Sequence, residues 1–179
     1  MRKLSAGFAI SIDGYILGSH GEMDWIVYDK EHYKRLAEQW DKTDVLLYGR
    51  KTYESIVTQN QASSVLKGPF AKMKHYVLSS TLKAVEPGFT LHPGNALEFV
   101  GDLKRNSGKN IAVFGGGELA ASLINLGVVD EPVLAISPVV LAGGLAFFDK
   151  INGRHLYDLK EVLSYSSGLV VITYTAKKM

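Results

Sequence analysis

The sequence predicts a three-layer α/β domain: a mostly parallel sheet with helices on both faces and an antiparallel hairpin at its C-terminal edge. Three observations support this fold class. Short apolar runs alternate with amphipathic stretches along residues 4–137. Two of these runs turn through glycine directly into a helical pattern. Finally, alternating runs at 156–164 and 169–176 flank the turn residues 166–168, which is typical of a hairpin.

The N-terminal part of the chain contains one strand pattern and one helix pattern. Residues 4–12 are small and apolar and predict a buried strand that ends at the turn residues Asp13-Gly14. Residues 30–41 predict a helix capped by Asp29. One face of this helix is expected to be buried, because apolar side chains recur at helical spacing: Tyr33, Leu36, Ala37 and Trp40.

The rest of the chain continues the alternation. A strand at 44–48 leads through a glycine turn into a helix at 52–57, the polar stretch 59–68 is expected to be loop, and a strand follows at 74–79. The next helix opens with a capping box, and the one after it closes at a glycine. These two helices are expected at 95–105 and 118–126, and the remaining strands at 111–114, 132–137 and 145–148.

Composition limits the class of protein. With 179 residues, 46% hydrophobic and 21% charged, the chain is expected to form a single domain over residues 1–179. A net charge of +2 gives no large field to recruit nucleic acid or a membrane, and no apolar run approaches the roughly 20 residues of a membrane span. Cysteine is absent, which excludes disulfides and fits a reducing cytoplasm, the expected location.

Residues 111–119 contain the strongest candidate binding motif. An apolar strand passes through Gly115-Gly116-Gly117 into a helix, and the spacing Gly115-x-Gly117-x-x-Ala120 matches the dinucleotide-binding fingerprint. Glycine lets the backbone approach a ligand closely, and free N–H groups at a helix start attract an anion such as a pyrophosphate. A tight turn without a ligand is the alternative. The late position of the motif excludes the ordinary Rossmann fold.

A second strand–glycine–helix turn contains Gly49, Arg50, Lys51 and Thr52. The planar fork of arginine suits a phosphate monoester. Two cations and a hydroxyl at one helix start would favour a 2′-phosphate, and hence NADP over NAD. The alternative is that two basic residues on a turn are merely solvated.

Hydroxyl side chains follow the strand expected at 74–79. Ser79, Ser80 and Thr81 could bind phosphate or ribose at the end of that strand. Alternatively, they only cap a turn.

Carboxylates in the early part of the chain are candidates for proton transfer. Asp13, Asp24 and Asp29 could donate or relay a proton to a substrate at an open sheet edge. Each also has a structural interpretation: Asp13 precedes a turn glycine, and Asp29 can cap a helix.

Several other chemistries are excluded. The five histidines are scattered, and none pairs with a carboxylate at ligand spacing, so no metal site is expected. There is no G-x-S-x-G nucleophile elbow. The stretch after Gly101 departs from the P-loop pattern, because six residues separate it from Gly108 and Asn110 stands where Ser or Thr is needed.

Taken in order, these motifs resemble the dihydrofolate reductase superfamily, and most closely the branch that contains the reductase domain of riboflavin biosynthesis. The resemblance extends over nearly the whole chain. It rests on Ser11-x-Asp13-Gly14-Tyr15, Asp24-Trp25, Gly49-Arg50-x-Thr52-Tyr53-Glu54, Val77-Leu78-Ser79, Gly115-Gly116-Gly117, and Asp130-Glu131 leading to Pro138. It implies a dihydrofolate reductase-like fold and NADPH as the cofactor.

The resemblance also implies which residues hold the cofactor. Gly49, Arg50, Lys51 and Thr52 would hold the 2′-phosphate and pyrophosphate region, and Ser79 and Ser80 would approach the adenosine. The start of the later helix would bind pyrophosphate and ribose through Phe114, Gly115, Gly116, Gly117, Glu118 and Leu119. Ala9 and Ile16 would border the nicotinamide.

The match departs from the family at the substrate end. Folate reductases place an acidic residue near the start of the first long helix, where this chain has Lys30, and a shift by one residue makes Asp29 the candidate catalytic residue. Many relatives contain P-x-x-L-G-x-G where residues 138–144 have Ala142 at the first glycine, and riboflavin-type enzymes contact a phosphorylated substrate there. The deaminase domain often fused to the riboflavin reductase is not in this sequence, so the bifunctional enzyme is not expected.

Three functions agree with these features. The expected one is an NADPH-dependent reductase of a small heterocyclic substrate, resembling 5-amino-6-(5-phosphoribosylamino)uracil reductase. The alternatives are a non-catalytic NADP(H)-binding relative and a dihydrofolate reductase. The expected partners are a small-molecule substrate and a second copy of the chain, because relatives commonly form homodimers, with no nucleic acid or membrane partner.

Overall fold

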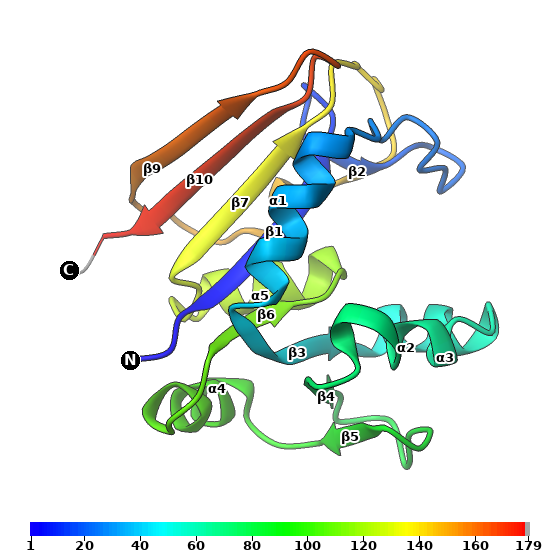
Figure 1. The fold of residues 1–179 in the computed structure, drawn as a ribbon, viewed down its shortest axis with the longest axis vertical. Coiled ribbons are helices and arrows are strands. Elements are labelled where there is room, and N and C mark those ends of the chain that lie inside the picture. Colours follow the sequence, from blue (N-terminus) through cyan, green and yellow to red (C-terminus); the bar gives the residue numbers. More distant parts are fainter. Residues whose placement is uncertain (178–179) are drawn as a thin grey trace.

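The computed structural model describes residues 1–177 and contains ten strands and five α-helices (Figure 1). The strands are β1 (Leu4–Ile10), β2 (Tyr15–Leu17), β3 (Thr43–Gly49), β4 (Lys74–Leu78), β5 (Phe89–His92), β6 (Asn110–Val113), β7 (Glu131–Ile136), β8 (Leu145–Ala146), β9 (Tyr157–Ser164) and β10 (Val170–Ala176). The helices are α1 (Lys30–Trp40), α2 (Arg50–Thr58), α3 (Ala62–Val65), α4 (Ala96–Arg105) and α5 (Gly117–Asn125), with short 3₁₀ turns η1 (Gly68–Phe70) and η2 (Phe148–Lys150).

The main sheet confirms the predicted fold class. Its eight strands run in the order β5-β4-β3-β6-β1-β7-β10-β9. Every neighbouring pair from β5 to β7 is parallel, whereas β10 pairs antiparallel with both β7 and β9. The C-terminal hairpin therefore forms one edge, as its alternating pattern predicts. Helices cover both faces, which completes the three layers.

Several local features of the structure differ from the sequence predictions. The stretch 59–68 is not only loop, because it contains α3 and the start of η1. The strand expected at 145–148 is shortened to β8, which pairs with β2 in a separate two-stranded sheet, and η2 follows at once. β5 was not expected from the sequence. Its four residues form a strand because they pair with β4, a contact that local pattern does not reveal.

One face of the sheet packs tightly against α4 and α5. Side chains of β1, β3 and β6 that point to this face form a continuous apolar core with the two helices: Leu4, Ala6, Phe8, Val45, Leu47, Ile111, Val113, Val100, Leu103 and Leu123. α5 alone buries Ala120, Ala121, Leu123 and Ile124. This face supplies the main hydrophobic core of the domain.

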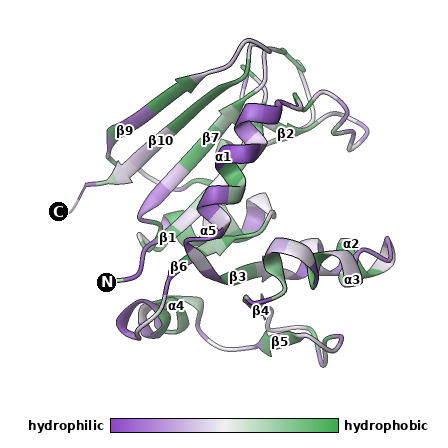
Figure 2. Cartoon of the chain, in the orientation of Figure 1, coloured by the Kyte–Doolittle hydropathy of each residue, from purple (hydrophilic) through white to green (hydrophobic). Residues whose placement is uncertain are grey.

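The opposite face is packed under α2 and open under α1. Leu46, Tyr48 and Val77 of the sheet pack against Tyr53 and Ile56 of α2. α1 crosses in front of the sheet and has hydrophilic residues along much of its length (Figures 1 and 2).

α1 contains no buried residue. The buried face predicted for residues 30–41 is therefore wrong, and Ala37 and Tyr33 are exposed. Much of the helix lies over a cavity, and only its C-terminal residue Trp40 packs against a cluster on this face, where it contacts Phe70 and Phe114. Among residues 1–177, no helix has the length and apolar content that crossing a membrane requires.

Candidate functional site

Three neighbouring strand ends bring the predicted cofactor motifs to one edge of the sheet. β4, β3 and β6 are adjacent and parallel, with Gly49 opposite Leu78 and Leu47 opposite Val113. The residues that follow these strands therefore meet at the same carboxyl edge, which is where open α/β sheets bind ligands. This edge contains the turns at Ser79, Arg50 and Gly115.

The starts of α2 and α5 touch each other at this edge. A Cβ on Gly49 would lie 3.2 Å from Cβ of Leu119, and a Cβ on Gly116 would lie 2.7 Å from the Thr52 hydroxyl oxygen. Neither helix start has a side-chain cap. The first turns of both helices therefore have N–H groups without a side-chain partner, and such groups favour an anion.

Gly116 shows why this turn requires glycine. Its φ is +83°, a left-handed conformation that other residues adopt only at a cost, and any side chain would collide with Thr52. The absence of a Cβ therefore lets Thr52 of α2 approach the start of α5 closely. These residues fit the pyrophosphate of a dinucleotide.

Charged side chains surround the two helix starts. Arg50 pairs with Glu54 at 3.1 Å on the same helix, and Lys51 Nζ lies 2.8 Å from Glu118 Oε1. The same carboxylate pairs with Lys150 of η2. These two lysines, Lys150 first, lower the pKa of Glu118 to about 2, so it stays ionised. The sequence offered no signal for Lys150, because it lies far along the chain from the helix that it joins.

The remaining predicted cofactor residues take different positions. The Ser79 hydroxyl accepts hydrogen bonds from the Thr81 and Leu82 amides at 3.2 and 3.1 Å, so it caps a turn at this edge of the sheet. Ser80 is exposed beside it. Ile16 of β2 covers Gly117, where a Cβ would meet its side chain.

A cavity of about 370 Å³ lies between α1 and the sheet. Its floor comes from β1, β6, β7 and β10, and its roof from α1, including His32, Leu36 and Trp40. The volume is within the range of small-molecule sites, and most of the lining is apolar. Three predicted cofactor residues line the cavity as well: Ala9, Phe114 and Gly115. The sheet edge that carries the predicted cofactor motifs and the cavity are therefore adjacent.

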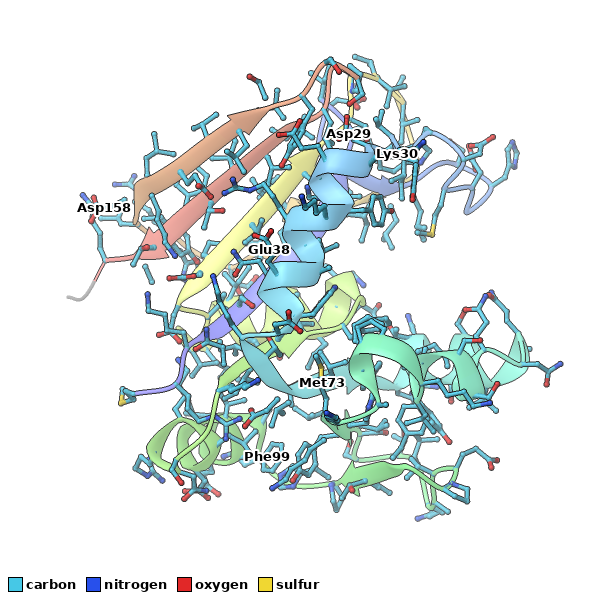
Figure 3. The ribbon with its side chains drawn as sticks, in the orientation of Figure 1. Asp29, Lys30, Glu38, Met73, Phe99 and Asp158 are labelled. Carbon is cyan, nitrogen blue, oxygen red and sulfur yellow. The ribbon has the colours of Figure 1, made fainter. Side chains whose placement is uncertain are left out.

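Asp29 occupies the N-cap of α1, as one of its two interpretations predicts. Its Oδ1 accepts from the Glu31 and His32 amides at 3.0 Å each, and its Oδ2 accepts from the Ser167 hydroxyl at 2.7 Å. Figure 3 shows Asp29 and Lys30 at the same end of α1. These hydrogen bonds, that of the His32 amide first, lower the pKa of Asp29. Asp29 does not line the cavity, and its catalytic role stays a prediction.

Asp13 also has a structural task. It accepts a hydrogen bond from the Ser11 hydroxyl at 2.6 Å and from the Leu141 and Ala142 amides at 3.1 and 2.8 Å. These bonds, that of Ser11 first, lower its pKa to about 2. Asp13 thus anchors the 138–144 loop to the end of β1. Within residues 1–177, no three His, Asp or Glu side chains are arranged to hold a metal ion.

Comparison with known proteins identifies the family. The family model that describes the RibD C-terminal domain matches residues 2–171 of this chain. The chain belongs to the RibD C-terminal domain family. Among curated proteins, it is 33% identical over 179 residues to the uncharacterized protein YyaP of Bacillus subtilis, covering 97% of this chain and 94% of that protein. It is 26% identical to YwjB of the same organism, covering 89% and 90% of the two chains.

Solved structures of this family and of dihydrofolate reductase share the fold. A Shewanella sp. PV-4 protein described under riboflavin biosynthesis superposes with a TM-score of 0.82 at 23% identity, covering 98% of this chain and 99% of that one. The Thermotoga maritima deaminase and 5-amino-6-(5-phosphoribosylamino)uracil reductase gives 0.73 at 15%, covering 98% and 57%. Dihydrofolate reductase from Enterococcus faecalis, complexed with NADP(H), gives 0.68 at 16%, covering 98% and 97%. At these identities the likeness establishes the dihydrofolate reductase-like fold.

Proposed function

We propose that this protein is an NADPH-dependent reductase of a small heterocyclic substrate, resembling 5-amino-6-(5-phosphoribosylamino)uracil reductase. One observation supports this most directly: Ala9, Phe114 and Gly115 belong both to the predicted cofactor site and to the cavity lining. A nicotinamide next to Ala9 would therefore face a cavity large enough for a heterocycle.

The chain's own residues would bind and orient the two reactants. NADPH would supply the hydride when bound. The first turns of α2 and α5 would hold its pyrophosphate, and Arg50 and Lys51 would hold the 2′-phosphate. α1 would exclude water from the substrate by covering the cavity.

Cofactor titration tests the phosphate assignment. Purified protein is titrated with NADPH and with NADH, and dissociation constants are measured by fluorescence. We expect tighter binding of NADPH and a loss of that preference in Arg50→Ala, since a hydrogen-bonded charge contact is worth about 1.5–3 kcal/mol. Arg105→Ala is the matched control, because Arg105 is also exposed and paired within its own helix, with Asp102. Equal binding of both cofactors, unchanged by Arg50→Ala, would refute the assignment.

The predicted acid role of Asp29 has a test of its own. Asparagine caps a helix about as well as aspartate but cannot deliver a proton. Asp29→Asn is expected to leave the free energy of unfolding unchanged within about 0.5 kcal/mol. A large fall in kcat in this variant would support Asp29 as the acid, and an unchanged kcat would restrict Asp29 to capping.

A non-catalytic NADP(H)-binding protein is the second candidate. The observation that favours it is the position of the carboxylates that line the cavity, Glu131 and Glu161: both belong to strand segments far from Ala9. Such a protein would bind NADPH without oxidising it in the presence of uracil-type or pterin substrates. Oxidation of NADPH with dihydrofolate would instead identify a dihydrofolate reductase.

We also propose that the protein forms a homodimer and is located in the cytoplasm. β9 is the edge strand, and two of its large apolar side chains are exposed, Leu159 at 62% and Val162 at 51%. Such side chains at a sheet edge suit an interface with a second copy. Sedimentation velocity of the wild type and of Val162→Lys tests this, with a monomeric wild type as the contrary result.

A further inference from the structure

Gly7 is exposed although it lies in the middle of a central strand. β1 is hydrogen-bonded to β6 on one side and to β7 on the other, so its backbone is covered in the plane of the sheet. Its neighbours Ala6 and Phe8 are buried on the α5 face. Gly7 faces α1, where it lines the cavity. The exposed surface of Gly7 is therefore cavity surface.

The space above Gly7 is large enough for a side chain. A Cβ placed there would meet only Cβ of Val133, at 3.9 Å, which is an ordinary van der Waals contact. Nothing in the backbone therefore requires glycine at this position. What glycine does here is leave part of the cavity floor without any side chain.

The cavity continues along β1 beyond Gly7. Residues Lys3, Ser5, Gly7 and Ala9 all line it, and they span about 20 Å at the usual rise of a strand. Ala9 lies beside the predicted nicotinamide, and Lys3 lies at the other end. A single heterocycle at Ala9 would occupy only part of this length.

The far end of the cavity is polar. Lys3 and Lys160 pair with the same Glu131 carboxylate at 2.5 and 2.8 Å, and Asn110 lines the cavity next to them. Arg35 and Glu161 form another pair on the lining. This end therefore offers hydrogen-bond donors and acceptors, whereas the middle offers mainly apolar contacts.

We propose that Gly7 determines the length of the substrate: by leaving the floor open, it lets a heterocycle at Ala9 carry a polar extension along β1 toward Lys3. This inference rests on the proposed function for the position of the heterocycle. The open floor itself rests on the exposure of Gly7 and on the room above it.

Single cysteines test the open floor, because the natural chain has none. Ser5→Cys, Gly7→Cys and Ala9→Cys are each treated under native conditions with methyl methanethiosulfonate and with the bulkier benzyl methanethiosulfonate. We expect all three thiols to react with both reagents. Ala6→Cys is the matched control, since Ala6 is 0% exposed and is the chain neighbour of Gly7 on the opposite face.

The control thiol should react only when the protein opens. Native domains are folded in an excess of about a thousandfold or more, so Gly7→Cys should react at least about a thousandfold faster than Ala6→Cys. If Ala6→Cys does not fold, Ala120→Cys in α5, also 0% exposed, replaces it. A Gly7→Cys thiol that reacts no faster than the control would overturn the proposal, and so would reaction with the methyl reagent alone.

NADPH separates this inference from the proposed function. We expect NADPH to slow the reaction at Ala9→Cys at least tenfold and to leave Ser5→Cys unchanged within twofold. If NADPH protects none of the thiols, the cofactor assignment fails while the open floor stands. If NADPH protects Ala9→Cys but Gly7→Cys is unreactive, the cofactor assignment stands and the substrate-length proposal fails.

Discussion

α5 and α1 lie on opposite faces of the same sheet, and of the two only α5 has fully buried residues. Both helices have apolar residues at helical spacing, yet α5 buries four of its nine residues and α1 buries none. β1 contributes to the difference, because it presents Leu4 and Phe8 to α5 but Ser5 and Gly7 to α1. An amphipathic pattern indicates which side of a helix faces inward. Whether that side meets side chains or a cavity depends on the strand opposite.

The largest expected effect compares one leucine from each helix. Leu123→Ala in α5 should lower the free energy of unfolding by about 2–5 kcal/mol, because Leu123 is 0% exposed in the core. Leu36→Ala in α1 should cost about 1 kcal/mol or less, since Leu36 is half-buried above the cavity. Urea unfolding measures both. Equal losses would mean that the cavity closes in solution and that α1 packs as α5 does.

The next comparison places valine on the two faces of β1. Ala6→Val should destabilise the protein by about 1–3 kcal/mol, because it overfills the packed core. Gly7→Val should be neutral or stabilising by up to about 1 kcal/mol, because valine fits the cavity and favours strands. Thermal unfolding of the two variants distinguishes the faces. A destabilised Gly7→Val would show that the room above Gly7 is smaller than the structure indicates.

Two histidines on the α1 side should differ in their effect on acid stability. His75 is buried, its Nδ1 lies 2.9 Å from the Tyr48 hydroxyl and its Nε2 lies 3.1 Å from the Phe70 carbonyl. Burial lowers the pKa of His75, and it also lowers that of half-buried His32, where Asp29 opposes the effect.

Because these folded-state pKa values lie below the unfolded value of about 6.5, the unfolded chain takes up protons first as pH falls. The stability that the two neutral histidines contribute is therefore fully present above about pH 6.5. It is lost as pH falls from there toward their folded-state pKa values. We expect His75→Asn to remove more of this pH dependence than His32→Asn, as measured by urea unfolding at about pH 7.5 and pH 5.5. A larger change in His32→Asn would indicate that the cavity around His32 is drier than the region around Tyr48.

The smallest expected effect concerns the ion pair that joins α1 to β9. Arg35 and Glu161 lie 2.9 Å apart, with 44% and 43% of their side chains exposed. Arg35→Ala should cost between zero and about 1 kcal/mol, and less at high salt, because exposed pairs are screened. Urea unfolding of both proteins at low and at high ionic strength measures this loss in the free energy of unfolding. A loss well above this range would show that the pair, rather than packing, holds α1 over the cavity.

Much of the fold and of the cofactor edge could be predicted from local pattern. The strands before Gly49 and Gly115 are apolar runs that end in glycine, and both helices start where expected within a few residues. Neighbouring parallel strands then bring such turns together, so Thr52 and Gly116 meet without any further signal. The N-cap position of Asp29 could also be predicted from the neighbouring residues alone.

The parts that could not be predicted depend on contacts between distant segments. Lys150 reaches Glu118 only because η2 packs beside α5. β5 is a strand only because β4 lies next to it. The buried face expected for α1 failed for the same reason, since its burial depends on the side chains of other elements that face it, Ser5 and Gly7 among them.

The sequence by itself determined the three-layer class, the C-terminal hairpin and the two glycine turns, because each depends on the periodicity and conformational preferences of neighbouring residues. Only the tertiary structure decided that α1 stands over a cavity and that this cavity includes Ala9, Phe114 and Gly115 of the predicted cofactor site. The physical reason is that a cavity is a property of two facing surfaces. The sequence shows Gly7 only as a small residue in a strand, and its place on the cavity floor depends on the position of α1.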